Sequence, residues 1–475
     1  MFNNNYGERM KNISIWKDTV KHKKYKVLDG NLETDILIIG GGITGVSNYY
    51  FLKKNNFKVV LVEQNEIGMS VTSNSTGKLS FLQNDLLSNI RDNLGEEVAS
   101  SYLKSQIEAI NLVVKIIRKE KINCDLVKTK SMVYTNDDSK IKEMEELKEF
   151  LKRNNIDVYN DECSLVNSKY TISVNNTYLF HPIKFVYGLL KDNSDVYEHT
   201  GIKKIKMKND LYYCYTDKYV IKTKYVIIAS HYPYFNIPFM FPLKASLEKS
   251  YLSASKYSTN TLSCISYSNP FVSLRTYNDY LIYLSNSHAL NNDLSDKKHF
   301  NDLKKKLKDL NLIPEYLWSN IDIMTNDGLP YIGEIDNKMF IATGYNTWGL
   351  ASSVLSGKVI ASILLKEDNP YIDLFDPRRV NIDQVIKGVK SIYQSINGFI
   401  KGYAYTNDKV QEKGKTYLYS NNQVLKKCPH LKCKLLFNEV EETWDCPCHG
   451  SRFDVTGKCI SGPSNQDIKI LKDDV

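Results

Sequence analysis

Continuous apolar runs and helical repeats alternate along the first half of the chain. The runs 34–39, 57–62 and 224–230 have the composition of buried parallel strands. Between them, apolar residues recur at every third or fourth position over 96–119 and 140–153. This spacing predicts two amphipathic helices. The first half of the chain therefore has the pattern of an α/β domain.

A second pattern appears between residues 243 and 287, which contain segments of alternating apolar and polar residues. Such alternation predicts antiparallel strands. Helices are expected over 182–190, where Pro182 suits the first turn, and over 295–310. A strand over 339–343 leads into a final helix. The chain is therefore expected to combine a parallel sheet with an antiparallel one.

The first apolar run leads directly into a glycine-rich turn. The order is strand, G-x-G-x-x-G, a helix to residue 54, a second strand and then Glu63. Gly40 allows the tight turn, Gly42 lets the backbone approach a pyrophosphate, and Gly45 lets the helix pack on the strand. The helix N-terminus, including Ile43 and Thr44, would face the phosphates. The complete unit predicts a bound dinucleotide, with Glu63 accepting from ribose hydroxyls.

Near the end of the chain, cysteines and histidines have metal-ligand spacing. Cys428 and His430 form a C-x-H pair, and Cys446 and His449 form a C-x-x-H pair after fifteen intervening residues. Two thiolates and two imidazoles suit a Rieske [2Fe–2S] cluster, with Cys₂ on one iron and His₂ on the other. A structural zinc site is the alternative, because similar spacings occur in zinc ribbons.

The surrounding residues resemble the Rieske proteins of respiratory cytochrome bc complexes. The resemblance continues through 444–454 and the Gly462-Pro463 pair. Cys433 and Cys448 stand where those proteins carry a disulfide that joins the two cluster loops. The resemblance implies an iron–sulfur cluster rather than zinc and a Cys433–Cys448 disulfide, which would be unusual in a reducing cytosol.

The longer part of the chain resembles the FAD-dependent family of D-amino-acid and glycine oxidases. Landmarks of that family match 67–79, 198–202, 325–333 and 344–350, and the resemblance spans 35 to about 365. It implies FAD as the dinucleotide, residues 198–202 as a strand beside the adenine, and a final helix whose N-terminus stabilises the reduced flavin. The implied FAD contacts are Gly68, Ser73, Thr76, Gly77, Lys78, Ile202, Gly344, Thr347, Trp348, Gly349 and Leu350.

Together the two resemblances predict the domain order. Residues 1–32 form an N-terminal extension, 33–370 the flavin oxidoreductase, 371–398 a linker and 399–475 the Rieske domain. The expected fold class is α/β plus β. It consists of a Rossmann-like FAD domain of the glutathione-reductase type, with an inserted antiparallel substrate domain around 243–324, followed by a small all-β domain. This order resembles a bacterial family of two-domain FAD/Rieske oxidoreductases.

Composition narrows the possible surroundings of the protein. The 475 residues are 42% hydrophobic and 25% charged, as in ordinary globular proteins. No apolar run approaches the ~20 residues that cross a membrane, and the first thirty residues lack the apolar core of a secretory signal. The +9 charge is spread over many lysines. We expect a cytoplasmic protein without a membrane span or a nucleic-acid partner.

The two cofactors predict the kind of reaction. A flavin accepts two electrons as a hydride, whereas a Rieske cluster carries one. Their combination predicts oxidation of a small amine or amino-acid-like substrate, with electrons passed singly to an acceptor protein or a small carrier. One alternative is a redox sensor or electron carrier without substrate turnover. Another is a flavoprotein that acts on RNA, although the sequence has no dedicated RNA module.

Candidate substrate contacts depart from the oxidase pattern. Where amino-acid oxidases place an arginine that binds the substrate carboxylate, this chain has Asp322. A carboxylate there favours a cationic amine, unless Asp322 is an ordinary surface acid. Arg275 could replace the missing arginine, or it could be a structural arginine of the sheet. His231, Tyr232 and His288 are further candidates, and no catalytic base is assigned.

Two residues bear on the reduction potential of the cluster. Respiratory Rieske proteins raise the potential with hydrogen bonds from a serine and, two residues later, a tyrosine. Ser451 is present here, but Phe453 stands at the tyrosine position and cannot donate. The potential is therefore predicted to lie below the top of the roughly −150 to +300 mV Rieske range.

Overall fold

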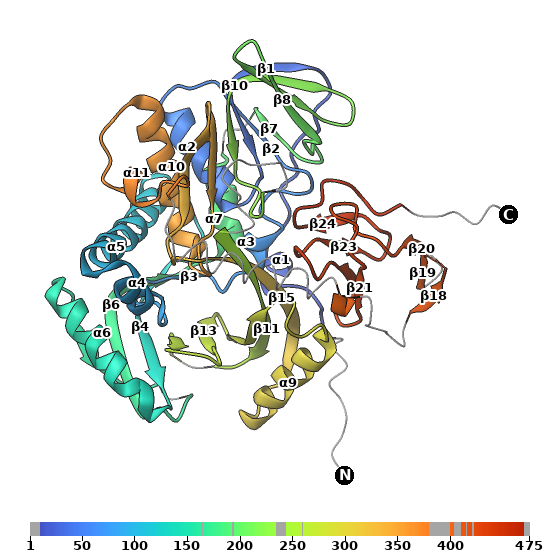
Figure 1. Cartoon of the computed structure of the whole chain (residues 1–475). Helices are drawn as coiled ribbons and strands as arrows, with labels where there is room; N and C mark the ends of the chain where they lie inside the picture. Colours follow the sequence, from blue (N-terminus) through green and yellow to red (C-terminus); the bar gives the residue numbers. More distant parts are fainter. Residues whose placement is uncertain are drawn as a thin grey trace.

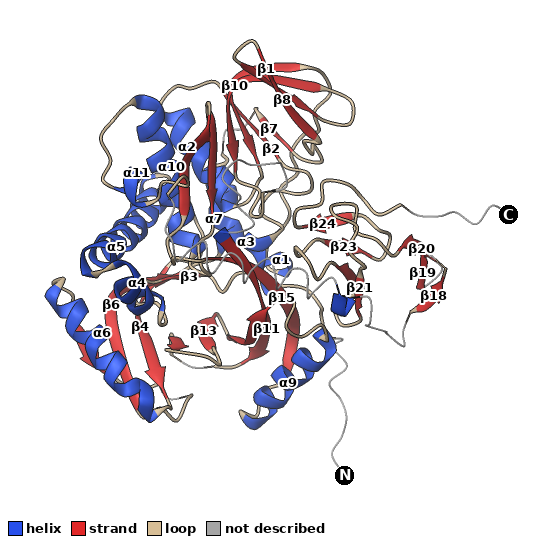
Figure 2. Cartoon of the chain, viewed as in Figure 1, coloured by secondary structure: helices blue, strands red, loops and turns tan. Residues whose placement is uncertain are grey.

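The computed structural model describes residues 10–163, 165–191, 194–233, 244–258, 260–379, 400–402, 410–414, 416–419 and 422–469. Two β-rich layers with helices around them form the larger body, and the C-terminal strands form a small lobe beside it (Figures 1 and 2). The expected fold class is confirmed. The remaining residues, including most of the predicted linker, lie outside the described part.

The first sheet of the larger body is mainly parallel. Its order is β16-β17-β10-β1-β2-β7, with β9 paired to β10 and β8 paired to β9, and the pairs from β17 to β7 are parallel. The last four residues of β1 and all of β2 are buried, as expected for strands covered on both faces. The strands are β1 (Leu32–Ile39), β2 (Val59–Val62), β7 (Val196–Tyr197), β8 (Lys204–Lys208), β9 (Leu211–Tyr215), β10 (Val220–Ile228), β16 (Tyr331–Asp336) and β17 (Met339–Thr343).

The second sheet has the order β15-β11-β14-β13-β12-β4-β6-β3, with β5 on β6. All of its pairs are antiparallel except β12 with β4. The strands are β3 (Lys78–Leu79), β4 (Val127–Thr135), β5 (Val158–Asn160), β6 (Tyr170–Leu179), β11 (Ala245–Lys256), β12 (Ser263–Ser266), β13 (Ser273–Tyr277), β14 (Tyr280–Ala289) and β15 (Pro314–Thr325).

Helices surround the sheets as the periodicity predicts. The helix expected over 96–119 has these bounds in the structure, and α10 packs on both α2 and α5. The helices are α1 (Ile15–Asp18), α2 (Ile43–Lys54), α3 (Val71–Asn74), α4 (Leu86–Leu94), α5 (Glu96–Lys119), the 3₁₀ turn η1 (Asp138–Lys140), α6 (Ile141–Arg153), α7 (Pro182–Leu189), α9 (Asp296–Asp309), α10 (Gly349–Leu365) and α11 (Tyr371–Leu374).

The C-terminal lobe contains two small antiparallel sheets in the described part. Trp444 and Phe453 are fully buried in its core together with the thiols of the cluster motif. The strands are β18 (Gln411–Lys413), β19 (Thr416–Tyr419), β20 (Asn422–Leu425), β21 (Leu436–Asn438), β22 (Thr443–Asp445), β23 (Arg452–Asp454) and β24 (Cys459–Ser461).

One segment differs from expectation, and the start of the predicted linker has contacts with the flavin body. The segment 198–202, predicted as a strand, is a loop in the structure. The strand β7 ends just before it, and His199 within it has a left-handed backbone with φ of 49°. The segment predicted as a linker begins on the flavin body, because α11 packs on α5 and Arg379 binds Asp327 at 2.7 Å. Packing thus orders residues whose sequence lacks a strong periodic pattern.

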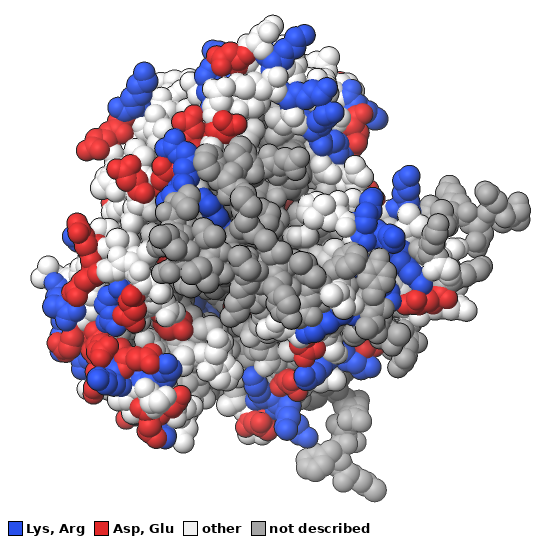
Figure 3. Space-filling model, viewed as in Figure 1, with Lys and Arg blue, Asp and Glu red and all other residues white. Residues whose placement is uncertain are grey.

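The surface agrees with a dispersed charge. On the face in Figure 3, acidic and basic residues lie among one another over the coloured surface. Among the described residues, no helix is both long and apolar enough to span a bilayer.

Candidate functional site

A cavity lies where the carboxyl ends of β1 and β2 meet the second sheet. Most of the predicted FAD contacts line it. The lining contacts are Gly40, Gly42, Ile43, Thr44, Glu63, Thr76, Lys78, Ile202, Thr347, Trp348, Gly349 and Leu350. Gly45, Gly68, Ser73, Gly77 and Gly344 are not among the described lining residues.

The turn before α2 has the shape that a pyrophosphate requires. Gly40 has φ of +114°, and a Cβ there would lie 2.5 Å from the carbonyl oxygen of Ala229. A Cβ on Gly45 would lie 1.8 Å from the carbonyl oxygen of Gly40, so only glycine permits this contact between helix and strand. The N-cap residue Gly42 has no side chain to cap α2, and the Ile43 N–H donates to the Thr72 hydroxyl at 3.0 Å. The other N–H groups of the first turn are therefore available to an anion, and the turn fits a dinucleotide.

Glu63 holds this turn together. Its carboxylate accepts hydrogen bonds from the backbone N–H groups of Gly41 at 2.7 Å and Asn65 at 2.8 Å. Burial raises the pKa of Glu63 and outweighs these two hydrogen bonds, which lower it. The carboxylate thus links the first turn to the end of β2 at the place where a ribose would lie.

A strained turn precedes α10. Asn346 and Thr347 have φ of 50° and 70°, and a β-branched residue rarely adopts such a conformation. The Asn346 amide holds the turn, because it accepts from the Thr325 N–H at 2.7 Å and donates to the Gly328 carbonyl at 2.8 Å. Strain of about 1–3 kcal/mol at such a position is typical of ligand sites. Here it directs the N-terminus of α10 toward the cavity.

Four side chains hold the loop over 73–77 by hydrogen bonds to its backbone carbonyls. Ser14 donates to the carbonyl of residue 73, Trp318 to that of residue 74 at 3.0 Å, and Trp16 to that of residue 75 at 2.7 Å. Arg275 donates to the carbonyls of residues 76 and 77 at 3.1 and 2.7 Å. Every carbonyl of the loop thus has a donor.

The contacts of Arg275 fit the second of its two alternatives, a structural arginine of the sheet. Arg275 is 2% exposed, donates to the Phe180 and Thr276 carbonyls as well, and is not among the described residues that line the cavity. It therefore supports the loop over 73–77. Ser14 and Trp16 were missed, because they lie in a segment that reads as a polar extension.

The opposite wall of the cavity carries two carboxylates. Asp322 on β15 lies directly across from Glu248 on β11, and both line the cavity. Asn320 donates to Asp322 at 3.0 Å. Burial raises the pKa of Asp322 to about 6, and burial with the charge of Asp322 raises that of Glu248 to about 7. Glu248 was missed, although its place in the alternating segment puts it on a defined face of the strand.

The histidine and tyrosine candidates separate into two groups. His231 lines the cavity, and burial lowers its pKa to about 4. The neutral ring therefore donates from Nε2 to the carbonyl of Ile321 at 2.9 Å. Tyr232 is not among the described residues that line this cavity, and its ring lies 6.0 Å from that of His449. His288 stacks on His299 at 4.1 Å and is not among the described cavity residues.

The four predicted cluster ligands converge in the small lobe. Cys428 and Cys446 are 0% and 2% exposed and lie in the same core cluster. The rings of His430 and His449 lie 5.1 Å apart, and both Nδ1 atoms are buried without a partner in the described part. Burial lowers the pKa of both imidazoles. Two thiols and two neutral, unpartnered imidazoles fit a [2Fe–2S] cluster.

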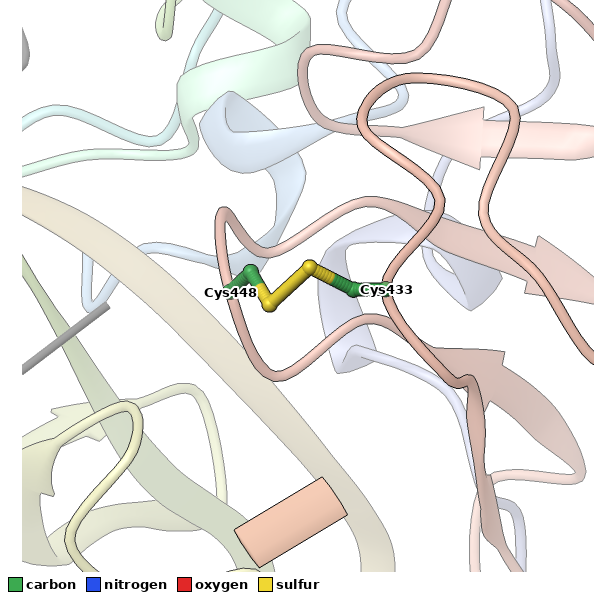
Figure 4. The surroundings of a disulfide bond; sticks show 2 residues. All are labelled: Cys433 and Cys448. Atoms are coloured by element: carbon green, nitrogen blue, oxygen red, sulfur yellow. A yellow bond between two sulfur atoms is a disulfide. The ribbon is translucent and has the colours of Figure 1, made fainter. Parts of the chain in front are cut away.

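The two other cysteines of the motif are bonded to each other. Cys433 and Cys448 form a disulfide with an S–S distance of 2.09 Å, which joins the two loops (Figure 4). The sulfurs of Cys433, Cys446 and Cys448 also lie within 4.8 Å of one another, as in a metal site. Because two of these sulfurs are in the disulfide, only Cys446 of the three remains as an iron ligand.

The small lobe packs its cluster loops against the flavin body. A second, smaller cavity between them is lined by His231, Tyr232, His449 and Gly450. A Cβ on Gly450 would lie 3.2 Å from the Ile321 side chain, so the backbone approaches β15 closely. The two cavities share Ser70, Val71, Asn74, His231, Asn320, Ser461 and Gly462.

Buried charges fasten this interface. Lys249 on β11 is 3% exposed and contacts Asp296 at 2.7 Å and Asp445 at 2.8 Å, the latter next to Cys446 in sequence. Burial alone would raise the pKa of Asp445, but Arg452 and Lys249 outweigh burial and hold it well below its usual range. Removing one partner of such a buried pair is costly. The network therefore favours one fixed position of the lobe.

Comparisons with known proteins agree with both parts. Residues 35–363 match the FAD dependent oxidoreductase family, and residues 410–472 match the Rieske [2Fe-2S] domain. A Rieske 2Fe-2S iron–sulfur protein of Bacillus subtilis strain 168, YhfW, is 27% identical, and the alignment covers 96% of this chain and 97% of that protein. Gamma-glutamylputrescine oxidoreductase of Escherichia coli K12 is 21% identical over 75% of this chain and 89% of its own length.

Solved structures support the same fold. Glycine oxidase from Geobacillus kaustophilus aligns with a TM-score of 0.61 and 16% identity, covering 74% of this chain and 100% of that one. L-proline dehydrogenase from P. horikoshii aligns with a TM-score of 0.60 and 17% identity, covering 74% and 98%. The family match spans more than half of the chain. This protein therefore belongs to the FAD-dependent oxidoreductase family and carries a C-terminal Rieske domain, so that it is an enzyme with FAD and a [2Fe–2S] cluster.

Proposed function

We propose that the protein oxidises a small amine and passes the electrons one at a time through its Rieske cluster to an acceptor. When bound, FAD supplies a two-electron hydride acceptor and the cluster a one-electron carrier. Cys428 and Cys446 would bind one iron, and His430 and His449 the other. The single observation that carries the proposal is the packing of the His449 loop against the wall of the flavin cavity.

The contacts at this wall suit electron transfer within one chain. His231 lines both cavities, and the neighbouring Tyr232 lies beside the ring of His449. Ser461 and Gly462 of the small lobe form part of the flavin cavity itself. Protein groups from both parts therefore line the space between the two sites, and the buried Lys249–Asp445 ion pair joins the lobe to the flavin body.

An amine substrate is supported by the charges of the cavity. Lys78 is the only lysine or arginine among the described lining residues, and its Nζ donates to the Cys264 carbonyl and the Ser273 hydroxyl, both at 2.7 Å. Burial lowers the pKa of Lys78 to about 7. A substrate carboxylate would meet Glu248 and Asp322 without an arginine to bind it. A cationic amine is the complementary ligand.

An anaerobic titration tests this function. The purified holoenzyme is mixed with primary amines, secondary amines and amino acids while flavin absorbance and the EPR signal of the cluster are followed together. We expect an amine to bleach the flavin and then to produce the reduced-Rieske signal. In Cys428→Ser, the same amine should bleach the flavin without that signal. The function is wrong if dithionite reduces both centres and no amine or amino acid reduces either.

A further inference from the structure

The two carboxylates of the cavity form a pair across neighbouring strands. Glu248 and Asp322 are direct partners in the antiparallel register of β11 and β15. Side chains at such positions have Cβ atoms about 4.5–5.5 Å apart. Like charges placed this way repel each other, so a folded chain keeps both only where a proton or a cation lies between them.

In the described part of the chain, neither Glu248 nor Asp322 forms an ion pair with a lysine, arginine or histidine. No side chain there supplies the cation that would offset their repulsion. Lys249, the next residue on β11, belongs to the network with Asp296 and Asp445. His231 uses its Nε2 on the Ile321 carbonyl. The pair thus faces a cavity that has room for a ligand.

A third group beside the pair also lacks a partner. Asn320 is 6% exposed and lines the cavity. Its Nδ2 donates to Asp322, whereas its buried Oδ1 has no hydrogen-bond partner in the described part. A buried amide oxygen without a donor costs about 1–3 kcal/mol. A ligand N–H group would satisfy it.

The protonation of the pair follows from its surroundings. Burial and then the charge of Asp322 raise the pKa of Glu248 to about 7, with a smaller contribution from Asp85, while a hydrogen bond from Ser287 lowers it. Burial raises the pKa of Asp322 to about 6 and outweighs the hydrogen bond from Asn320, which lowers it. Near neutral pH the pair is therefore partly protonated, and it becomes fully anionic only at higher pH.

We propose that Glu248, Asp322 and Asn320 form the binding site for the substrate ammonium group, and that the carboxylate pair takes its proton before oxidation. In this step the proton moves from the ammonium nitrogen to a carboxylate oxygen, and no other bond changes. The products are a neutral amine and a carboxylic acid. The neutral amine has the lone pair that loss of a hydride from the adjacent carbon requires. This inference rests on the proposed function and assigns the substrate class and a proton acceptor to the same cavity.

The test uses a cation that cannot be oxidised. tert-Butylammonium carries no hydrogen on the carbon next to nitrogen, and tert-butanol is its neutral counterpart. Binding of each to the FAD-loaded protein is measured by the change in flavin absorbance between pH 5 and 8. We expect the cation to bind at least about tenfold more weakly at pH 5, because both carboxylates are then protonated. Binding of the alcohol should not depend on pH.

Variants assign the effect to the pair. Glu248→Gln and Asp322→Asn should each weaken binding of the cation about tenfold or more at pH 8 and flatten its pH dependence. Glu97→Gln, on the exposed first turn of α5, is the matched control and should match the wild type. If a variant fails to bind FAD, infrared titration of the wild-type carboxyl groups, with and without tert-butylammonium, still measures whether the cation lowers their pKa.

The possible failures are distinguishable. Equal binding of cation and alcohol, or wild-type binding by both variants, overturns the ammonium site. If amines reduce the flavin while either result is found, the inference fails and the proposed function stands. If no amine reduces the flavin but the cation binds with the expected pH dependence, the site is supported and the proposed reaction is wrong.

Discussion

Arg275 provides a quantitative test of how the flavin loop is held. Its buried guanidinium donates to four backbone carbonyls, at residues 76, 77, 180 and 276. Arg275→Met removes these donors while keeping an apolar stem against Trp16. The Gly77 carbonyl keeps the Phe180 N–H at 3.1 Å, so up to three carbonyls lose their donor. At about 1–3 kcal/mol for each buried carbonyl, the loss is roughly 3 kcal/mol at the lower end.

Part of this cost is recovered. Burial is unfavourable for the charged group and lowers the pKa of Arg275 to about 9. Methionine does not have this penalty. We therefore expect a net loss of about 2–3 kcal/mol, divided between global stability and the order of the loop. If about 2 kcal/mol appears in cofactor binding, the Kd for FAD rises roughly 30-fold.

The assay combines FAD titration, by quenching of flavin fluorescence, with thermal unfolding of the protein with and without FAD. Arg378→Met is the control, because Arg378 is 52% exposed and bonds only to nearby Asp376 in the described structure. The control should match the wild type. If Arg275→Met binds FAD with wild-type affinity and unfolds at the wild-type temperature, Arg275 does not hold the loop.

Three further predictions concern the small lobe. Phe453→Tyr should raise the reduction potential of the cluster in a redox titration, since it restores a donor; an unchanged potential contradicts this explanation. Lys249→Met should remove the lysine from Asp445, which keeps Arg452 at 3.1 Å, and destabilise the interface by about 1.5–3 kcal/mol, as for a lost hydrogen bond to a charged group; this is measurable as faster proteolysis between the domains, and wild-type proteolysis counts against it. Cys433→Ser with Cys448→Ser removes a cross-link of 15-residue separation, worth about 3 kcal/mol, and should speed cluster loss, seen as bleaching of its absorbance; wild-type cluster loss contradicts this.

A pH dependence follows from the carboxylate pair. Burial raises the pKa of Glu248 to about 7 and that of Asp322 to about 6. Both groups are anionic above these values, so flavin reduction by a saturating amine should become faster as pH rises from 5 to 8. Stopped-flow absorbance measures the rate. A rate that falls over this range, or stays constant, contradicts a role of the pair as proton acceptor.

Local spacing accounts for what the sequence predicted. The glycine turn, Glu63 and the cysteine–histidine motif are each confined to a short stretch, where residue spacing alone constrains the geometry. The α5 bounds were predicted for the same reason, because a long amphipathic repeat determines its own ends. These features needed no knowledge of distant packing.

The missed features depend on contacts between distant segments. Trp16 reaches the flavin loop across 59 positions, and Lys249 reaches Asp445 across 196. Glu248 lay in a correctly predicted strand, but its importance appears only when β15 places Asp322 beside it. The sequence left Arg275 as a substrate ligand or a structural arginine, and only its four carbonyl partners favour the structural role. Such pairings require the tertiary structure.

The most direct test of the account is the rate at which the cluster is reduced by the flavin of the same molecule. Stopped-flow absorbance and freeze-quench EPR would follow flavin and cluster after anaerobic mixing with a reducing amine, at protein concentrations that differ about tenfold. The account predicts that cluster reduction follows flavin bleaching at a rate independent of protein concentration. A rate proportional to protein concentration, or a cluster that stays oxidised beside a reduced flavin, would contradict it.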